Sequence, residues 1–453
     1  MENIISNQRA FFNTNQTKNI DFRIKQLQKL KTLLQKNEER LEKAIYEDFS
    51  KSAFDNYSNE LALLYLEIDD ATRNLKKWSA RKRVSTNLVN FPARSYIIPE
   101  PLGVSLIIGA WNYPYQLSFA PAIAAIAAGN TVVLKPSELP ANTSRTMAEI
   151  INQNFEPEFF IVVEGGVQET QLLLQQRFDK IFFTGSVPVG RIVYQAAAKH
   201  LTPVTLELGG KSPAFILDDK NLDIYVKRLV WAKFLNAGQT CIAPDYILVK
   251  SSLKDALIQQ LIAEIGKEQF SIGNQNYVQI ISEKNINRLA KYIDKNKVVY
   301  GGNYDLATRV FEPTVMDNVT FDDAVMQEEI FGPILPVIAF ESVDDVIAAV
   351  KRREKPLSCY VFTQDKKLRD KILHEISFGG GCVNDAIMHI SNSKMPFGGV
   401  GESGIGSYHG QFGFRTFSHY KSILDKPVWL ESGLKYFPHT PFKFKWMKRL
   451  LKL

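Results

Sequence analysis

One cysteine of the chain, Cys241, lies among small and polar residues in the stretch NAGQTCIAPDY (residues 236–246). A structural cysteine usually packs as a small hydrophobe, and most single cysteines are structural. The asparagine, glycine and proline around Cys241 interrupt both the helical and the strand pattern, which predicts a tight connection that a substrate can reach. A thiolate in such a place can attack a carbonyl carbon, so Cys241 is a candidate nucleophile.

Two other side chains could assist that attack. Asn112 ends the strand-like run LIIGAWNYP, and its amide could donate to a developing oxyanion, although an asparagine before Tyr113 and Pro114 is also typical of a turn. Glu207 lies in the β-branched run VTLELGG, where a carboxylate is either paired or has a raised pKa. A raised pKa suits a general base that activates water for hydrolysis of an acyl group on the cysteine.

Glycines and charged residues at the ends of other strand-like runs indicate a nucleotide site. Gly185 and Gly190 in KIFFTGSVPVG follow a strand at the start of a helix, where free N–H groups favour a phosphate, but they do not form GxGxxG and are weak evidence alone. Lys135 ends the run TVVLK and Glu138 follows three residues later, and the two form either a surface turn or a ribose site. With the cysteine, these features describe oxidation of a carbonyl compound with hydride transfer to a nicotinamide.

The elements that must position these residues can be read from the periodicity. Residues 21–83 have a helical pattern of leucines, and prolines in residues 88–103 indicate strands that leave the helical part. Short β-branched runs then alternate with helical ones, which predicts βαβ units with parallel sheets covered on both faces. We expect a glycine-rich loop at 394–410, close to other backbone, and a final strand at 413–428.

The composition limits the class of protein. The chain has 453 residues, of which 45% are hydrophobic, enough for two or three packed domains, and its net charge of +7 is mild, so we expect no nucleic-acid partner. We find no signal peptide or membrane-spanning run, and three cysteines are too few for a disulfide framework, which favours the cytoplasm. Cys359, Cys382, His409 and His419 are expected to be structural, and no metal is expected because no histidine pair has zinc spacing.

The motifs together resemble the aldehyde dehydrogenase superfamily over nearly the full length, and within it the class 3 and fatty aldehyde dehydrogenase branch. The motifs that carry the resemblance occur in family order: PLGVSLIIGAWNYP, KPSE, FFTGSVPVG, LELGGKSP, NAGQTC, EEIFGP and MPFGGVGESGIGSYHG. The resemblance implies an α/β fold with two βαβ-type domains and a bridging oligomerisation sheet. It also implies NAD(P)-dependent oxidation of a medium- or long-chain aliphatic or aromatic aldehyde by a homodimer.

The resemblance assigns a role to each candidate residue. It implies Cys241 as nucleophile, Glu207 as general base, and Asn112 with the Cys241 N–H as the oxyanion hole. The cofactor residues that it implies are Trp111, Lys135, Glu138, Gly185, Ser186, Gly190, Glu329 and Phe331. We expect NAD to be preferred, with NADP also accepted, because Glu138 would repel a 2′-phosphate while Lys135 attracts it. The alternatives are a CoA-acylating enzyme, which usually lacks such a base, and a cofactor-independent thiol esterase.

The same comparison divides the chain. We expect a cofactor domain at residues 1–207 with bridging strands at about 84–102, and a catalytic domain at 208–395. Residues 396–427 return to the cofactor domain and supply an oligomerisation strand, and residues 428–453 form a basic amphipathic tail. As a helix, FKFKWMKRLLKL separates apolar from basic side chains, so this tail either packs on the protein or its partner subunit, or attaches peripherally to an anionic membrane.

Overall fold

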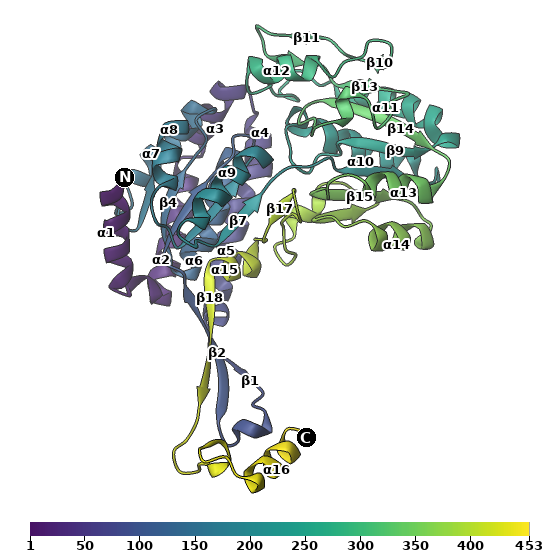
Figure 1. The fold of residues 1–453 in the computed structure, drawn as a ribbon. Helices are drawn as coiled ribbons and strands as arrows, with labels where there is room; N and C mark the ends of the chain where they lie inside the picture. The colour runs from purple at the N-terminus through teal and green to yellow at the C-terminus, as the bar shows by residue number, and fades with distance from the viewer. Residues whose placement is uncertain (453) are drawn as a thin grey trace.

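The computed structural model describes residues 1–452 and contains two α/β bodies and a long projecting arm (Figure 1). The first body is built on a six-stranded sheet in the order β17-β7-β6-β3-β4-β5, parallel except for β17. Its strands are β3 (Val104–Ile108), β4 (Thr131–Lys135), β5 (Phe160–Val162), β6 (Lys180–Thr184), β7 (Val204–Glu207) and β17 (Gly404–Ile405). The order reverses between β3 and β6, and ligands of such sheets bind beyond the carboxyl ends of the strands at this point.

Helices cover both faces of this sheet. One face carries α1 (Glu2–Asn13), α8 (Val167–Leu174) and α9 (Val187–Ala198), whose apolar residues form one core with the strands. The other face carries the helices α2 (Ile20–Lys36), α3 (Glu38–Phe49), α4 (Ala53–Asn56), α5 (Ala62–Trp78), α6 (Pro114–Ala128), α7 (Ala141–Asn152) and α15 (Gly410–Thr416). The strands between them are continuous apolar runs, as expected for a sheet buried on both faces.

Helix α6 shows how the local sequence determines an element beside the site. All of its residues are buried, which agrees with its apolar sequence on every side. It begins with Pro114, whose fixed φ and missing N–H suit the first turn of a helix. It ends at Gly129, whose φ of 95° is readily adopted only by glycine. The helix therefore starts two residues after Asn112 and holds that residue at the end of β3.

The second body contains a seven-stranded sheet in the order β10-β13-β14-β9-β8-β15-β16, parallel except for β10. Its strands are β8 (Pro213–Ile216), β9 (Tyr246–Lys250), β10 (Val298–Tyr300), β13 (Thr314–Met316), β14 (Ile334–Phe340), β15 (Ser358–Phe362) and β16 (Gly380–Val383). Its helices are α10 (Leu222–Phe234), α11 (Lys254–Glu268), α12 (Glu283–Ala290), α13 (Val343–Lys351) and α14 (Lys366–Glu375), and a small hairpin joins β11 (Tyr304–Asp305) to β12 (Val310–Phe311). Parallel sheets in both bodies confirm the expected α/β class.

The arm is a three-stranded antiparallel sheet that extends away from both bodies (Figure 1). It consists of β1 (Lys82–Val84), β2 (Arg94–Pro101) and β18 (Ser418–Asp425), and β18 pairs with β2 over eight residues. At its far end lies α16 (Pro441–Leu450). Leu453, the last residue of the predicted amphipathic tail, lies outside the described residues.

Two expectations about elements were wrong. The helical pattern was expected to begin at Asp21, but α1 precedes it and packs against β3 and β4. The final strand was expected to begin at Gly413, but residues 410–416 form α15 and the strand begins at Ser418. A Cβ on Gly413 would lie 2.9 Å from the Cβ of Ala124, so the missing side chain lets α15 pack closely on α6.

Candidate active site

A cavity of about 1050 Å³ is lined by residues of both α/β bodies. Its lining includes ten of the eleven predicted site residues: Trp111, Asn112, Lys135, Glu138, Gly185, Ser186, Glu207, Cys241, Glu329 and Phe331. The eleventh, Gly190, does not line the cavity. It lies within α9, where an added Cβ would be 2.7 Å from Leu208 Cδ2, so this glycine lets the helix pack against the residue that follows Glu207.

The loop that carries Cys241 has an unusual backbone. Asn236, Ala237 and Gly238 are three successive residues with positive φ, of 55°, 52° and 70°. Such conformations cost energy in residues other than glycine, and surrounding contacts must maintain them. Gln239 provides these contacts: its side chain donates to the carbonyl of Gln279 at 3.1 Å and accepts from the N–H of Ile281 at 3.0 Å.

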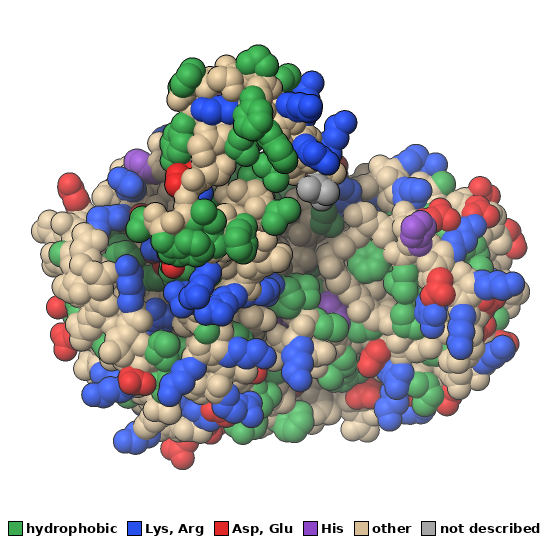
Figure 2. Space-filling view, turned by 90° about the horizontal axis from the view of Figure 1, so that it is seen from below, with side chains coloured by type: hydrophobic (Ala, Val, Ile, Leu, Met, Phe, Trp, Pro, Cys, Tyr) green, Lys and Arg blue, Asp and Glu red, His purple; other side chains and the backbone are tan. Residues whose placement is uncertain are grey.

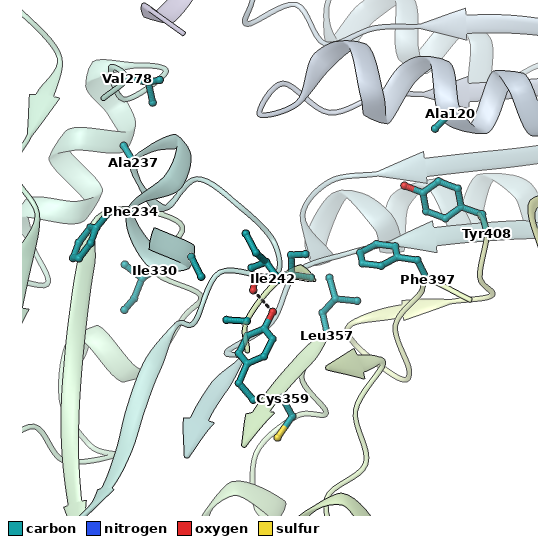
Figure 3. Packing of buried hydrophobic residues seen from close by; sticks show 14 of the residues in the cluster. Ala120, Phe234, Ala237, Ile242, Val278, Ile330, Leu357, Cys359, Phe397 and Tyr408 are labelled. Carbon is teal, nitrogen blue, oxygen red and sulfur yellow. Dashed lines mark hydrogen bonds between the residues drawn. The ribbon is translucent and has the colours of Figure 1, made fainter. Parts of the chain in front are cut away.

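Apolar packing fixes the other side of this loop. Tyr360, from the neighbouring strand β15, donates a hydrogen bond from its hydroxyl to the carbonyl of Ile242. Figure 3 shows Ile242 between two groups of buried side chains: Phe234, Ala237 and Ile330 on one side, and Leu357, Phe397 and Tyr408 on the other. The residue next to Cys241 is therefore held in the core, while Cys241 itself is only partly buried and lines the cavity.

The surroundings of Cys241 favour the thiol over the thiolate. Burial raises the pKa of the Cys241 thiol, and the carboxyl groups of Glu329 and Glu207 raise it further. Hydrogen bonds from the backbone of Cys241 and Ile242 act in the opposite direction. A deprotonated Cys241 would therefore accept backbone N–H groups but must lose its proton at a cost, so its reactivity should increase with pH.

Glu207 is the last residue of β7, and its carboxyl group has no partner. The residue is 3% exposed, and neither carboxylate oxygen accepts a hydrogen bond. Burial raises the pKa of Glu207 well above its ordinary value. A carboxyl group with a raised pKa that faces a cavity can take a proton from water, which is the behaviour expected of a general base.

Asn112 lies against the Cys241 loop at the end of β3. Its side-chain amide donates to the carbonyl of Gln239 at 3.0 Å, and its own carbonyl accepts from the side chain of Asn236 at 3.0 Å. Next to it, the hydroxyl of Tyr113 lies 2.7 Å from the hydroxyl of Thr240. The amide nitrogen has a second hydrogen available and lines the same cavity as Cys241, so it can donate to an oxyanion formed beside the sulfur.

The other half of the cavity fits a dinucleotide. Helix α9 begins after Ser186, no side chain caps its first turn, and Ser186 and Val187 line the cavity, so its N-terminus can receive a phosphate. Lys135 is buried at the end of β4, with its amino group 2.7 Å from the carbonyl of Pro136 and 3.7 Å from the carboxylate of Glu138. Burial lowers the pKa of Lys135. These groups can bind ribose hydroxyls and a pyrophosphate.

Glu329 and Phe331 line the same cavity as the cofactor residues and Cys241. Burial and the neighbouring Asp245 raise the pKa of Glu329 to about 8, and its carboxylate lies against Gly209, where an added Cβ would collide with it. Phe331 packs edge-on against Trp111, with ring centroids 5.3 Å apart. With Trp111, these side chains line the same cavity as the dinucleotide groups and the thiol.

Three residues that the sequence patterns do not reveal hold this segment in place. Lys211 donates to the carbonyl of Glu328 at 2.8 Å and forms an ion pair with Asp245. Asp245 accepts from the N–H of Ile330 at 3.0 Å, and Arg288 donates to the carbonyl of Ile330 at 2.8 Å. Lys211 and Asp245 lie in the quoted motifs LELGGKSP and NAGQTCIAPDY, but charge alone gives no sign of contacts to a segment more than 80 residues away.

The glycine-rich segment passes close to the strand of Glu207, as expected. Gly404 pairs with Glu207 in the register of β17 and β7, and the N–H of Leu208 donates to the carbonyl of Ser403 at 3.2 Å. An added Cβ at Gly398, Gly399 or Gly404 would meet backbone atoms. This segment therefore needs glycine to approach the strand that carries the candidate base.

Cys359, Cys382, His409 and His419 do not line the cavity. Cys359 is buried in β15, and Cys382 is partly buried with its sulfur 3.5 Å from Nδ1 of His389. His409 is buried, and burial lowers its pKa to about 4. His419 lies in the arm, in β18.

In residues 1–452 we find no helix that is both long and apolar enough to span a bilayer.

Comparison with known proteins gives the family. The family model described as "Aldehyde dehydrogenase family" matches residues 1–423. The chain is 46% identical to 4,4′-diaponeurosporen-aldehyde dehydrogenase of Staphylococcus aureus over 98% of this chain and 97% of that protein. It is 45% identical to aldehyde dehydrogenase family 3 member A2 of Pongo abelii over 100% and 94%. The solved structure "Substrate bound state of Staphylococcus Aureus AldH" aligns with a TM-score of 0.96 at 45% identity, over 99% of each chain.

Two further relatives bear on the cofactor. One is the canine "Aldehyde dehydrogenase, dimeric NADP-preferring", 42% identical over 95% of this chain and 96% of that protein. The other is the structure of a Mycobacterium tuberculosis aldehyde dehydrogenase complexed with NAD⁺, with a TM-score of 0.85 at 28% identity over 94% and 90% of the two chains. The cavity described above has the groups that such a cofactor requires. The chain belongs to the aldehyde dehydrogenase family and is an NAD(P)-dependent enzyme of its class 3 and fatty aldehyde dehydrogenase branch.

Proposed function

We propose that the enzyme oxidises an aldehyde to a carboxylic acid through a thioester on Cys241, which is hydrolysed by water that Glu207 activates. The observation that carries this proposal is the buried carboxyl group of Glu207. It has no hydrogen-bond partner, and it lines the same cavity as the thiol and the dinucleotide groups. A carboxyl group without a partner costs stability, and such groups occur where chemistry needs them.

The reaction then follows from the side chains. After Cys241 loses its proton to solvent, its sulfur forms a bond to the aldehyde carbon, and the amide of Asn112 and the N–H of Cys241 donate to the oxygen that becomes negative. A bound nicotinamide would supply the acceptor for the hydride that leaves that carbon, and loss of this hydride would turn the hemithioacetal into a thioester. The ionised carboxylate of Glu207 then takes a proton from water, the water oxygen bonds to the acyl carbon, and the carbon–sulfur bond breaks to release the acid and the Cys241 thiolate.

Several residues would hold the cofactor in this scheme. Lys135 and Glu138 would contact the adenine ribose, the N-terminus of α9 at Gly185 and Ser186 would contact the pyrophosphate, and Glu329 and Phe331, with Trp111, would contact the nicotinamide ribose and ring. Lys135 and Glu138 form an ion pair that lines the cavity. Glu138 would repel a 2′-phosphate and Lys135 would attract it, so we propose a modest preference for NAD over NADP.

We propose that the substrates are medium- or long-chain aliphatic or aromatic aldehydes. The name of one relative supports a long apolar substrate, because that protein is a 4,4′-diaponeurosporen-aldehyde dehydrogenase. The partly buried Cys241 also packs against a large apolar core. An aldehyde panel of increasing chain length, assayed by NADH formation, should give kcat/KM values that rise with length, and a preference for the shortest aldehydes would contradict the proposal.

Cys241→Ala distinguishes this reaction from the alternatives. It should abolish NADH formation with every aldehyde while NAD binding, measured by calorimetry, stays near that of the wild type. Turnover within tenfold of the wild type would refute the role of Cys241. Ester hydrolysis without any NAD binding would favour a cofactor-independent esterase, and product formation that requires coenzyme A would favour an acylating enzyme.

We propose that two chains form a homodimer through their arms. We also propose that the enzyme is cytoplasmic. Strands β1 and β18 are the two edges of the arm sheet and are largely exposed, and exposed edges are available for pairing. The name of one relative includes the word dimeric. Light scattering at micromolar concentration should give twice the chain mass of 51.4 kDa, and a mass near that of one chain would contradict the dimer. The three free cysteines are consistent with a reducing compartment.

We also propose that the tail contacts an anionic membrane surface. Helix α16 buries no residue, and Lys443 donates to the nearby carbonyls of Tyr436 and Pro438, so the contacts of the helix with its own chain are local and leave most of its apolar side chains exposed. Figure 2 views this end of the molecule, where apolar and basic side chains share the surface. The exposed apolar residues of the tail include Trp429, Phe437, Phe442, Phe444, Trp446 and Leu451. The protein should cosediment with anionic vesicles only when residues 442–453 are present, and equal recovery of both forms in the supernatant would exclude the role.

The sheets support the proposed division of the chain. We propose a cofactor domain at residues 1–207, a catalytic domain at 208–395, a return to the first domain at 396–427, and a tail at 428–453. The strands of the two large sheets lie on either side of residue 207, apart from β17, and β17 and β18 belong to the returning segment.

A further inference from the structure

A buried ion pair lies behind Asn112 and outside the cavity. Lys51 and Glu60 are 1% and 0% exposed, and Nζ of Lys51 is 2.6 Å from Oε1 of Glu60. Neither residue lines the cavity or contacts the nucleophile loop directly. A buried ion pair is weak evidence for stability, because the cost of removing two charges from water offsets their attraction. The location of this pair therefore needs another explanation.

Glu60 caps the helix that follows Asn112. Its second oxygen accepts from the N–H of Tyr115 at 2.8 Å and from the N–H of Gln116 at 3.2 Å. These are free N–H groups in the first turn of α6, and Tyr113 at the N-cap position provides no side-chain bond to them. The negative charge of Glu60 also matches the positive end of the helix dipole. Glu60 thus determines where α6 begins.

Lys51 holds the two residues before that helix. Its ammonium group lies 4.1 Å from the ring centroid of Tyr113 and 3.5 Å from the carbonyl oxygen of Asn112. The same carbonyl accepts the bond from Asn236 of the nucleophile loop. The backbone of Asn112 is therefore fixed from two directions, by Lys51 on one side and by the Cys241 loop on the other.

The local backbone around Glu60 is specialised. Residues Tyr57–Leu61 form a π-helical turn between α4 and α5. Such turns are rare and occur frequently at functional sites, because the extra residue shifts one side chain relative to a regular helix. Here the turn includes the carboxylate that reaches α6.

We infer that Lys51 and Glu60 are positioning residues that set the orientation of the Asn112 amide toward the Cys241 sulfur. This inference rests on the proposed function, in which Asn112 stabilises the oxyanion. The pair acts through the start of α6 and through the backbone carbonyl of Asn112, and it touches neither substrate nor cofactor. Its loss should slow formation of the acyl-enzyme and leave cofactor binding unchanged.

The test is a double-mutant cycle on the first turnover. Stopped-flow NADH formation is measured for the wild type, Lys51→Met, Asn112→Ala and the double variant. Asn112→Ala should slow the first turnover about 100-fold or more, as for loss of an oxyanion donor. Lys51→Met should slow it about 10- to 100-fold through misplacement, and the additional effect of Lys51→Met in the Asn112→Ala background should be below about threefold.

Folding is controlled by two further variants. Glu60→Gln keeps the side-chain size and one oxygen acceptor, and Lys51→Met/Glu60→Leu replaces the pair with apolar residues, an exchange that proteins often tolerate. Both should bind NAD as tightly as the wild type and show the slower first turnover. Arg40→Ala, which removes the exposed pair of Arg40 and Glu149, is the matched control and should keep the wild-type rate.

The outcomes separate the inference from the proposed function. A wild-type first turnover in Asn112→Ala would refute the role of Asn112 itself. A slow Asn112→Ala combined with effects that multiply in the double variant would overturn only the role of Lys51, because a general structural defect adds to any other defect. A wild-type rate in Glu60→Gln or in the apolar pair would likewise overturn it.

Discussion

The Glu207→Gln variant should gain stability relative to the wild type as the pH rises. Unfolded Glu207 loses its proton near an ordinary pKa of about 4.3, whereas burial raises its pKa in the folded protein. The folded state therefore retains a proton that the unfolded state has released. The stabilising contribution of this difference is complete below the unfolded pKa and is lost as the pH rises toward the folded pKa. Glutamine does not titrate, so the variant avoids this loss.

The size of the effect follows from the protonation difference. Between the unfolded and the folded pKa of Glu207, the wild type loses up to about 1.4 kcal/mol per pH unit relative to the variant. The unfolding entropy of a chain of 453 residues is about 0.95 kcal/mol/K, so each pH unit in this interval corresponds to a Tm shift of up to about 1.5 °C. The amide of glutamine has its own burial cost, but that cost does not change with pH.

Scanning calorimetry of the wild type and Glu207→Gln at several pH values measures this shift. The Tm of Glu207→Gln minus that of the wild type should increase as the pH rises above about 5, and it should level off once folded Glu207 has ionised. Glu341→Gln, at an exposed position, is the matched control and should show no such trend. A Tm difference that is constant with pH, or that changes in favour of the wild type as the pH rises, would refute the raised pKa of folded Glu207.

Three other predictions concern the same cavity. Because burial raises the pKa of Cys241, its alkylation by iodoacetamide should accelerate between about pH 6 and pH 9, and a constant rate would contradict the raised pKa of this thiol. Glu138→Gln should narrow the preference for NAD over NADP in kcat/KM, and a wild-type enzyme that uses NADP equally well would overturn that role. Gly238→Ala should lower activity at least about tenfold, because the φ of Gly238 is +70° and the added Cβ would meet the carbonyl of Gly332. Gly266→Ala, where an added Cβ lies in open space, is the control and should be neutral. Equal effects of the two substitutions would contradict the close packing of the loop that carries Cys241.

Much of the architecture could be predicted from the sequence, because the signals are local. Continuous β-branched runs such as TVVLK and KIFFT alternate with helical segments, and a parallel sheet covered by helices is the only economical way to bury them. Helices α1 and α15 were not predicted, because the contacts that stabilise them are not local in the sequence. Helix α15 contains Gly410 and Gly413, which lower helix propensity, and contact with α6 stabilises it despite this.

The candidate residues were found where a side chain contradicts its surroundings. Cys241 has polar neighbours in a tight turn, and Glu207 lies in an apolar strand, so each is unusual in the sequence alone. Gly190 was assigned to the cofactor site because the motif FFTGSVPVG resembles the family's pyrophosphate-binding helix. In the structure Gly190 does not line the cavity and lets α9 pack against Leu208, and its role toward the cofactor stays a prediction. Lys51 and Glu60 could not be found in this way, because their partners Asn112 and Tyr115 are more than 50 residues away and buried charges resemble surface charges in a sequence.

The central claim is that the acyl group is carried by Cys241 and released by Glu207, and mass spectrometry of Glu207→Gln tests it most directly. The variant is mixed with NAD and a long-chain aldehyde, quenched after one burst, and digested. We predict about one NADH per chain and an acyl adduct on the peptide that contains Cys241, because hydride transfer precedes the step that needs the base. An adduct on Cys359 or Cys382, or continued turnover without any adduct, would contradict the account.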